Sequence, residues 1–504
     1  MKVLLCWQLL CFGLSVVNCI GQFEEQAGER DWLKEFIGVP SKLSIHKGSV
    51  IYTASSDDGI IARIETKTGL AIWRTFLPES SVITSIKEYN NIIYIISKSN
   101  QDRYFSTPLL SALNAVTGSL VWDIALNTTS TRYSSPTDIV IDPSTGALTL
   151  LSGNTLYFAS SNGEIEWTWA SEDNKLHLSS LLKYSETSES ATEGTAEGAS
   201  EWVAVGCTVP DISSSTCGNV ALISVSKTTK VGKVHSYKPL TVTPSTLGTT
   251  LNRGLHRSSA LPTGATVYGS ASGETAALSV LRLGSNSVAS YPLPLTEGPK
   301  LVSVASVGGA PIASVCSPGT CTVHAYSYAK KEIAPILSCT GSSFASTGYS
   351  YSDILQPVGV YCASGEPSSL GGTRIALTKA ALSTSGEYTV ESLDINLPTI
   401  QLSNLAHIIG HASTGGVLLT TQSGVVLHAT GAGVGWLRDE GLARVQHAVL
   451  ADRSVIARAE ETGVPGVLER WALQADELKV SHAYIHTTLH ISHPCSYDMT
   501  VGME

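Results

Sequence analysis

Charge is scarce in this sequence, and no stretch of it is rich in one sign. Asp, Glu, Lys and Arg make up 15% of the 504 residues, with 32 Lys and Arg against 42 Asp and Glu and a net charge of −10. Proteins that bind nucleic acid usually carry a basic patch or stripe, which this sequence lacks. We therefore expect no nucleic-acid partner.

The short motifs of several enzyme classes are also missing. The sequence contains no G-x-S-x-G, H-E-x-x-H or G-x-x-x-x-G-K, and no C-x-x-C. Hydrolase, zincin, P-loop, zinc-ribbon and thioredoxin-type sites therefore lack their minimal parts. We expect no enzyme activity, no cofactor, no metal site and no small-molecule substrate.

Two weaker metal patterns have simpler interpretations. Four histidines are spaced as on one helix face and could bind zinc, but the residues between them favour extended chain: His482, His486, His490 and His493. The cluster Asp57-Asp58-Gly59 is interpreted as a turn between strands rather than a cation site.

The N-terminus has the pattern of a secretory signal peptide. After the early cation Lys2, an apolar run over 3–17 ends in small residues, and it is short for a membrane span. We predict a signal peptide at 1–21, cleaved near Gly21, and no membrane-spanning helix after it. One sequon, Asn127-Thr128-Thr129, agrees with a secretory route and makes Asn127 the predicted glycosylation site.

Seven cysteines follow residue 21, an odd number. In an oxidising compartment, closeness in sequence favours three local disulfides, although spacing alone does not fix their connectivity. The favoured pairs are Cys207 with Cys217, Cys316 with Cys321, and Cys339 with Cys362. Cys495 is left over.

A repeated motif provides the main evidence for the fold. The segments Thr68-Gly69 to Trp73, Thr117-Gly118 to Trp122, and Gly163 to Trp167 each place a tryptophan four residues after a glycine. The glycines lie 49 and 45 positions apart, about the length of one four-stranded propeller blade. The motif predicts a hairpin whose glycine adopts a positive φ and whose tryptophan is buried between neighbouring blades.

Further turn signals continue this pattern without the tryptophans. They lie at 227–230, 284–286, 330–331 and 385–386, and at 431–435 before Trp436, which we also assign to blade fastening. Together with the first three they give eight hairpins, which predicts an all-β, eight-bladed β-propeller over 22–450. Residues 185–200 have nothing to bury and predict a loop insertion. We assign 451–480 to a second domain or linker and 481–504 to a disordered tail.

The start of the mature chain resembles a known family. The segment from Glu24 to Trp32 has the pattern E-x-Q-x-G-x-x-D-W that opens subunit 1 of the ER membrane protein complex, where it precedes quinoprotein-like blades bearing T-G-x-x-x-W. The segment from Trp436 to Val445 resembles an element late in that family's first propeller. Cys339 and Cys362 fall where family members carry two cysteines. Family members are about twice as long.

The resemblance implies a lumenal scaffold that supports insertion and folding of tail-anchored and multi-pass membrane proteins. Its partners would be the other subunits of the complex and membrane-protein clients. Asp31 and Trp32 become candidate partner contacts, although Trp32 could equally plug the propeller end while Asp31 caps a turn. The T-G-x-x-x-W motif also occurs in quinoprotein dehydrogenases, which leaves such an enzyme, or a stand-alone lumenal peptide-binding propeller, as the alternative.

Overall fold

The structure is a computed structural model that describes residues 30–472 with gaps. The gaps are 35–38, 47–48, 56–58, 66–67, 78–80, 100–107, 127–136, 174, 186–199, 212–213, 215, 227–228, 238–241, 253–263, 272–275, 284–286, 295–300, 329, 352–356, 370, 384–386, 398–399, 403–404, 406, 412–414, 422–424, 431–432, 440–443, 452–453 and 462–463. Side chains are described from residue 59 to residue 437. Asn127, most of the predicted loop at 185–200 and the tail at 481–504 lie outside the described residues.

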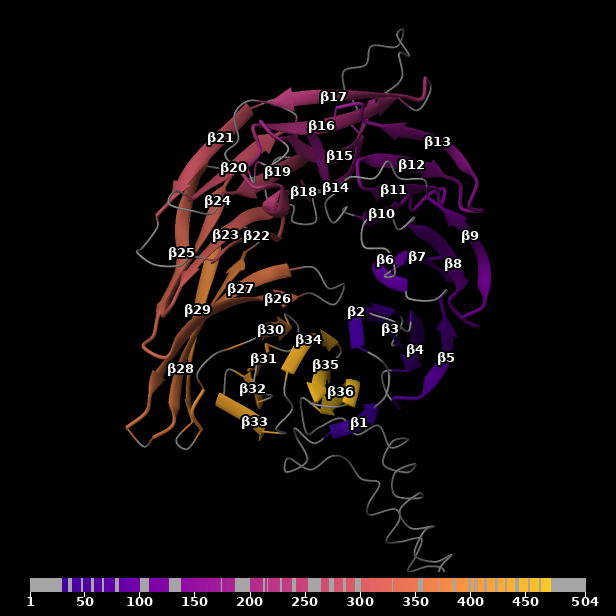
Figure 1. Cartoon of the computed structure of the whole chain (residues 1–504). Coiled ribbons are helices and arrows are strands. Elements are labelled where there is room, and N and C mark those ends of the chain that lie inside the picture. The colour runs from indigo at the N-terminus through magenta and orange to yellow at the C-terminus, as the bar shows by residue number, and fades with distance from the viewer. Residues whose placement is uncertain are drawn as a thin grey trace, which may run out of the picture.

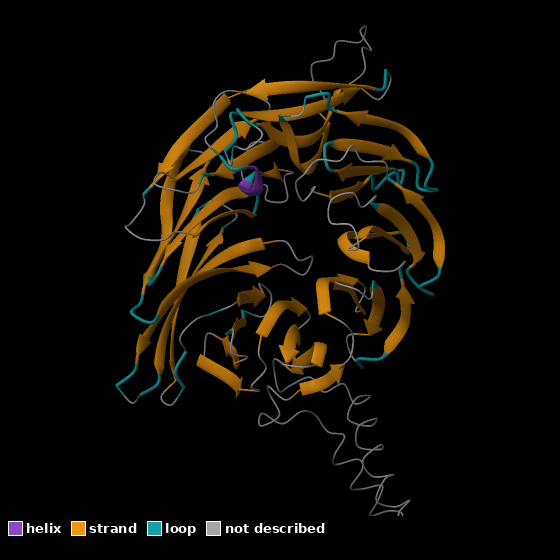
Figure 2. Cartoon of the chain, viewed as in Figure 1, coloured by secondary structure: helices purple, strands orange, loops and turns teal. Residues whose placement is uncertain are grey.

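The described chain is all β, as predicted. Its only helix is the short 3-10 helix η2 (Pro244–Thr246) (Figure 2). The strands pair into seven four-stranded sheets and one eight-stranded sheet. The eight-stranded sheet consists of two groups of four, joined where β26 and β30 pair in parallel. The strands thus form nine groups of four.

The groups follow one another along the chain, and the first four are built as follows. The first is β2 (Val39–His46), β3 (Ser49–Ser55), β4 (Ile60–Glu65) and β5 (Ala71–Phe76). The second is β6 (Ser81–Tyr89), β7 (Ile92–Ser99), β8 (Leu109–Asn114) and β9 (Leu120–Ala125). The third is β10 (Thr137–Ile141), β11 (Leu148–Ser152), β12 (Thr155–Ala159) and β13 (Ile165–Ala170). The fourth is β14 (Leu176–Ser185), β15 (Ser200–Thr208), β16 (Asn219–Ser226) and β17 (Val231–Tyr237).

The remaining five groups continue in the same order. The fifth is β18 (Gly248–Asn252), β19 (Gly264–Ser270), β20 (Ala276–Arg282) and β21 (Ser287–Leu293). The sixth is β22 (Leu301–Val307), β23 (Ala310–Ser317), β24 (Thr320–Ser327) and β25 (Glu332–Thr340). The seventh is β26 (Phe344–Tyr351), β27 (Pro357–Pro367), β28 (Thr373–Leu382) and β29 (Tyr388–Leu397). The eighth is β30 (His407–His411), β31 (Val417–Thr420), β32 (Val425–Thr430) and β33 (Gly433–Asp439), and the ninth is β34 (Arg444–Ala451), β35 (Ser454–Glu461) and β36 (Val464–Ala472) with β1 (Arg30–Lys34).

The groups are arranged as a ring in chain order (Figure 1). The first strands of most neighbouring groups touch, as in β2 with β6, β10 with β14 and β14 with β18, and β34 of the last group touches β2 of the first. Each group is an antiparallel meander that runs outward from the centre, so its fourth strand lies at the rim. This is the architecture of a β-propeller.

All eight predicted hairpins join the third strand of a group to the fourth. Three of them carry the predicted glycines, whose φ values are positive: 66° at Gly69, 73° at Gly118 and 88° at Gly163. In two later hairpins Lys230 and Lys331 take the same left-handed conformation, each with a φ of 55°. The spacing of the turn signals therefore identified the outer hairpin of each of the first eight groups.

The structure differs from the predicted boundary at residue 450 and from the predicted count of eight. Strands β35 and β36 lie beyond that boundary but pair with β34 before it, and β36 also pairs with β1 from the N-terminus. The last group is thus closed by both ends of the described chain. Its third and fourth strands, β36 and β1, are not joined by a hairpin, since β1 comes from the N-terminal end of the described chain.

The core of the molecule lies between the groups. Each of seven buried clusters draws residues from two neighbouring groups; one of them joins Ile61 and Trp73 of the first group to Ile93 and Leu113 of the second. Because the sheets stack face to face, inner strands bury both of their faces, as in the unbroken buried run of β16. Outer strands such as β5 bury one face only.

Candidate functional site

A row of tryptophan–glycine contacts joins the first three groups. A Cβ built on Gly118 would lie 2.5 Å from Cδ2 of Trp73, and one built on Gly163 would lie 2.7 Å from Cδ2 of Trp122. The ring of each motif therefore packs directly on the glycine of the next motif. Glycine is required at these positions for two reasons: the ring leaves no room for a Cβ, and the positive φ is one that L side chains rarely adopt.

Polar contacts hold the first of these rings in place. The indole Nε1 of Trp73 donates to the carbonyl oxygen of Ala115 at 2.8 Å, and the same oxygen accepts from Nη1 of Arg63 at 2.6 Å. Thr75 Oγ1 donates to the carbonyl oxygen of Gly118 at 2.6 Å. Trp73 is 8% exposed. The first group is thus bonded to the outer hairpin of the second by three side chains.

The threonines of the motif act within their own hairpins. Thr68 Oγ1 bonds the carboxylate of Glu65 at 2.5 Å and accepts from the backbone N–H of Leu70 at 3.2 Å. Thr117 Oγ1 lies 2.8 Å from Oγ of Ser119 and accepts from its backbone N–H. These bonds order the turn that presents the glycine.

The third motif uses a tryptophan that the sequence pattern did not single out. A Cβ on Gly232 of the fourth group would lie 2.5 Å from Cδ1 of Trp169. Trp167, the predicted fastener, instead stacks on Phe158 with ring centroids 3.9 Å apart. Both tryptophans contact the buried cluster shared with the fourth group, since positions two apart in a strand share a face.

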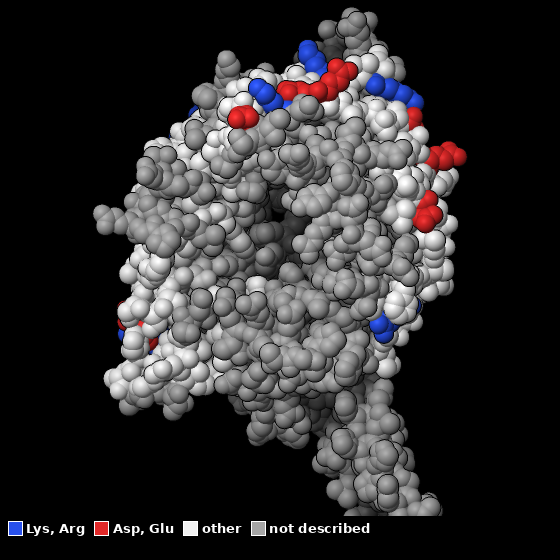
Figure 3. All heavy atoms as spheres, viewed as in Figure 1, with Lys and Arg blue, Asp and Glu red and all other residues white. Residues whose placement is uncertain are grey.

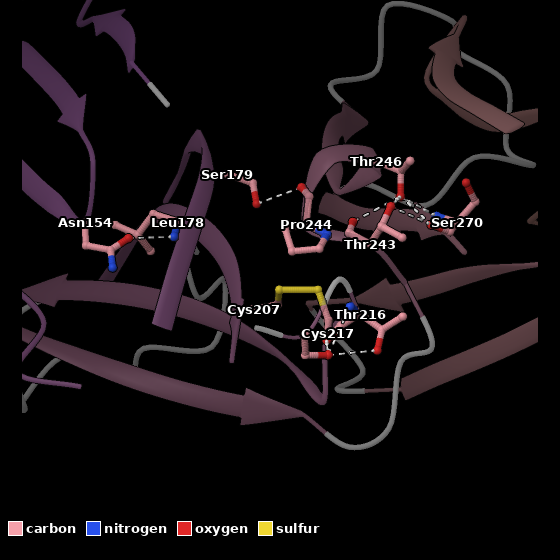
Figure 4. Close-up of a disulfide and its surroundings, with 11 residues drawn as sticks. Asn154, Leu178, Ser179, Cys207, Thr216, Cys217, Thr243, Pro244, Thr246 and Ser270 are labelled. Atoms are coloured by element: carbon pink, nitrogen blue, oxygen red, sulfur yellow. Dashed lines mark hydrogen bonds between the residues drawn. A yellow bond between two sulfur atoms is a disulfide. The ribbon is translucent and has the colours of Figure 1, made fainter. Parts of the chain in front are cut away.

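Beyond the tryptophans, neighbouring groups are joined by polar side chains that sequence analysis missed (Figure 4). Asn154 of the third group bonds the fourth with both ends of its amide: Nδ2 donates to the carbonyl oxygen of Leu176, and Oδ1 accepts from the N–H of Leu178 at 3.1 Å. Ser179 Oγ then donates to the carbonyl oxygen of Pro244 at 3.2 Å. The signal in the sequence was only one asparagine in a two-residue turn.

Between the fifth and sixth groups, the contacts are made by tyrosines and one arginine. The guanidinium of Arg282 lies 5.0 Å from the ring centroid of Tyr328 and 5.6 Å from that of Tyr326. Tyr328 Oη donates to Oγ1 of Thr266 at 2.9 Å. Burial raises the pKa of Tyr268, in the neighbouring strand β19, well above its usual range, so that phenol stays protonated. The cluster is a structural joint.

The structure contains the three disulfides that the cysteine spacing favours. Cys207–Cys217 ties β15 to the loop before β16 within the fourth group, as Figure 4 shows. Cys316–Cys321 joins β23 to β24 within the sixth group. Cys339–Cys362 joins β25 of the sixth group to β27 of the seventh.

The predicted partner contacts lie in the strand that closes the ring. Asp31 and Trp32 belong to β1, where Trp32 is the register partner of Arg470 in β36. This strand is the outermost of the ninth group. Trp436 lies in β33, opposite His428. Asn127 lies outside the described residues, so its glycosylation stays a prediction.

Apolar side chains are exposed on the outer strands of several groups. They are Leu70, Ile72, Phe76, Val116, Leu120, Val121, Ile165, Val231, Val234, Val390 and Val434, most of them on or beside β5, β9, β13 and β17. In the view of Figure 3, the charged side chains of described residues are of both signs and lie along the outer edge. The rim therefore carries exposed apolar side chains together with charged ones of both signs.

Lys183 lies beside two carboxylates, one in the third group and one in the fourth. Lys183 Nζ lies 2.5 Å from Oδ2 of Asp142, and this bond holds the pKa of the carboxyl well below its usual range. Glu201 lies 4.0 Å from the same ammonium. Among the described residues no three His, Cys, Asp or Glu side chains are placed to hold a metal ion. Nor does any described helix have the length and apolar content to cross a membrane.

Three solved structures with a similar chain course have low sequence identity to this chain. BamB from Moraxella catarrhalis is 12% identical with a TM-score of 0.39, over 89% of this chain and 99% of that one. Quinohemoprotein alcohol dehydrogenase from Comamonas testosteroni is 9% identical with a TM-score of 0.42, over 91% and 78%. Dihydro-heme d1 dehydrogenase NirN is 10% identical with a TM-score of 0.45, over 92% and 82%. No curated protein sequence matches the chain.

A family match covers the N-terminal part of the ring. Residues 22–205 match the family described as the EMC1 N-terminal beta-propeller domain. The matched residues include β1, the first three groups and the tryptophan–glycine contacts between them. The N-terminal part of this chain, residues 22–205, therefore belongs to the EMC1 N-terminal beta-propeller domain family, as the resemblance in its sequence predicts.

Proposed function

We propose that this chain is a lumenal scaffold in the ER membrane protein complex, supporting insertion and folding of tail-anchored and multi-pass membrane proteins. The observation that carries the proposal is the match of residues 22–205 to the EMC1 N-terminal beta-propeller domain. In this proposal the chain lies on the lumenal side of the ER membrane and contributes binding surfaces rather than catalysis. Its partners are the other subunits of the complex and membrane-protein clients.

The geometry of the ring suits a platform. Tryptophan, asparagine, arginine and disulfide contacts join the first four groups in succession and the fifth, sixth and seventh groups in succession. A sheet packed on both faces has little freedom to move relative to its neighbours. The rim leaves apolar side chains such as Leu70 and Phe76 exposed at 60% and 65%, which is a surface that a partner can cover.

Affinity purification tests the assignment to the complex. The full-length chain, tagged at its C-terminus, is expressed in cells and purified from detergent-solubilised ER membranes. We expect other subunits of the complex to co-purify. Recovery of the chain as a monomer with unfolded clients would support a stand-alone peptide-binding propeller instead, and a bound quinone absorbance would support a dehydrogenase.

Charge reversal tests the contact at the closing strand. In this proposal Asp31 contacts another subunit, so Asp31→Lys reduces the recovery of partner subunits while the chain keeps its thermal stability. Asp123→Lys, at an exposed position on the outer strand β9, is the matched control. Equal recovery of partners with both variants would remove Asp31 from the interface.

A glycosylation assay tests the lumenal location. If the ring lies in the ER lumen, Asn127 carries a glycan, and endoglycosidase treatment increases the electrophoretic mobility of the chain. Asn127→Gln abolishes that change. A chain that is insensitive to the enzyme and recovered from the cytosol would contradict the proposed location.

A further inference from the structure

Four cysteines lie together where the sixth group meets the seventh. Cys316 in β23 is the register partner of Cys321 in β24, and Cys321 is in turn the register partner of Cys339 in β25. Directly opposed residues of antiparallel strands project to the same face of the sheet. Cys321, Cys339 and Cys362 belong to one buried cluster, and Cys316 packs against it. The two disulfides are therefore neighbours.

Two further distances show how closely the pairs pack. The Sγ of Cys362 lies 3.6 Å from the carbonyl oxygen of Cys321. The Sγ of Cys316 lies 4.0 Å from Oγ1 of Thr347, and Thr347 is the register partner of Cys362 in the seventh group. The Cys339–Cys362 disulfide thus contacts β24, which carries Cys321, and Cys316 contacts β26, which pairs with the strand that carries Cys362.

The four cysteines differ in access to solvent. Cys321 and Cys362 are fully buried and Cys339 is 7% exposed, whereas Cys316 is partly exposed and adjoins a turn whose Pro318 is exposed. An external thiolate must approach the sulfur that it attacks. Cys316 is therefore the entry point for a reductant, and Cys321 is the leaving sulfur.

We propose that these four cysteines form a thiol–disulfide exchange relay in which Cys321 can take Cys339 from Cys362. An external dithiol attacks Sγ of Cys316, forms a mixed disulfide and releases Cys321 as a thiolate; its second thiol then frees Cys316 and leaves as the oxidised dithiol. The Cys321 thiolate attacks Sγ of Cys339, the Cys339–Cys362 bond breaks, and Cys362 leaves as a thiolate that takes up a proton.

The distances allow the new bond. Directly opposed residues of antiparallel strands have Cα atoms about 4.5–5.5 Å apart, inside the range of about 4.4–6.8 Å found for disulfides. The product Cys321–Cys339 links β24 to β25 within the sixth group. The covalent bond between the sixth and seventh groups is then lost. Reduction at Cys316 therefore removes the disulfide that joins these two groups.

Variants that leave one free thiol test the relay from both ends. Cys316→Ser frees Cys321, and Cys362→Ser frees Cys339; the full-length chain carries Cys495→Ser in each case, to remove the cysteine left outside the three pairs. Chains are alkylated in acid-quenched samples, digested without reduction and analysed by mass spectrometry. We expect a Cys321–Cys339 linked peptide in both variants, with Cys362 alkylated in the first and Cys316 alkylated in the second.

Graded reduction of the chain with only Cys495 replaced covers the case in which a variant does not fold. Limiting dithiothreitol should yield Cys321–Cys339 with Cys316 and Cys362 alkylated. Cys207–Cys217, in a different sheet, is the internal control. When this disulfide is reduced, both of its cysteines should be alkylated and neither should form a disulfide with another cysteine. Alkylation of Cys316 and Cys321 together, with Cys339–Cys362 intact and no Cys321–Cys339 peptide in any sample, would overturn the relay.

Discussion

The indole of Trp73 packs so closely on Gly118 that no side chain fits between them. A Cβ on Gly118 would lie 2.5, 2.6 and 2.8 Å from three carbon atoms of that ring, closer than real Cβ contacts. The two residues belong to consecutive repeats of one motif, and the second repeat supplies both a glycine for the ring of Trp73 and a ring, Trp122, for Gly163 of the third. The repeat is therefore a joint between blades as well as a turn.

Gly118→Ala is expected to destabilise the ring. The new methyl group meets the Trp73 ring, and the residue must also hold a φ of 73°. Left-handed strain costs roughly 1–2 kcal/mol and overpacking roughly 1–3 kcal/mol, so we expect a loss of about 2–4 kcal/mol in the free energy of unfolding. Urea unfolding followed by circular dichroism measures it.

Gly371→Ala is the matched control for that experiment. Gly371 also has a positive φ, 87°, but nothing lies within 4 Å of its Cβ position. There the substitution should add only backbone strain, which lowers the free energy of unfolding by about 1 kcal/mol. If both substitutions lower the free energy of unfolding equally, the contact between Gly118 and Trp73 does not contribute to stability.

Removing the ring should relieve the clash. Trp73→Ala leaves a cavity and removes one of the two hydrogen bonds to the carbonyl oxygen of Ala115, and we expect it to cost about 3–5 kcal/mol. In that background Gly118→Ala should cost only the backbone strain, about 1 kcal/mol. A double-mutant cycle measures the difference as a coupling energy. Additive losses would show that the two residues act independently.

Local patterns predicted the turns well because a hairpin is coded by adjacent residues. Glycine at a positive φ, and an asparagine such as Asn114 that bonds the N–H of Val116 and of Thr117, leave a signature at fixed spacing. The closure of the ring by β1 has no such signature, since its partner β36 lies more than 400 residues away in the sequence. The boundary at 450 was predicted from the sequence pattern alone, which does not show that β36 pairs with the N-terminal strand β1.

The joints between later groups were hidden for a related reason. The contacts of Arg282 with Tyr328 and of Asn154 with Leu178 cross from one sheet to the next, so the partners are set by the stacking of sheets and not by the spacing in the chain. Trp169 was missed because the motif pointed to Trp167, two residues earlier on the same face. The alternation of side chains along a strand shows which residues share a face, but it does not show which of two tryptophans on that face contacts the neighbouring group.

Asn154→Asp should weaken the joint between the third and fourth groups. The amide Nδ2 that donates to the carbonyl oxygen of Leu176 becomes a carboxylate oxygen, which cannot donate and repels that carbonyl. We expect a loss of about 1–3 kcal/mol in the free energy of unfolding at pH 7, measured by urea unfolding. Asn162→Asp, at an exposed turn position, should change it by less than about 0.5 kcal/mol. The prediction fails if the two substitutions have the same effect.

The stability of the ring should fall in mild acid because of His428. This side chain is 2% exposed, and burial lowers its pKa from 6.5 to about 4. Between these values the unfolded chain binds a proton that the folded chain does not, so the free energy of unfolding decreases as the pH falls from 6.5 toward 4 and is unaffected by this group above 6.5. The full effect is about 3 kcal/mol, since each pKa unit corresponds to about 1.4 kcal/mol.

His428→Gln tests this by removing the titrating group while keeping a polar side chain of similar size. Urea midpoints measured at pH 7, 6, 5 and 4.5 should fall less steeply for the variant than for the parent chain. His235→Gln is the control, because His235 is partly exposed, lies on the outer strand β17 and has a smaller lowering of its pKa. Its pH profile should stay close to that of the parent. Parallel profiles for the parent and His428→Gln would show that other groups cause the acid sensitivity, since the buried imidazole would then contribute no proton linkage in this range.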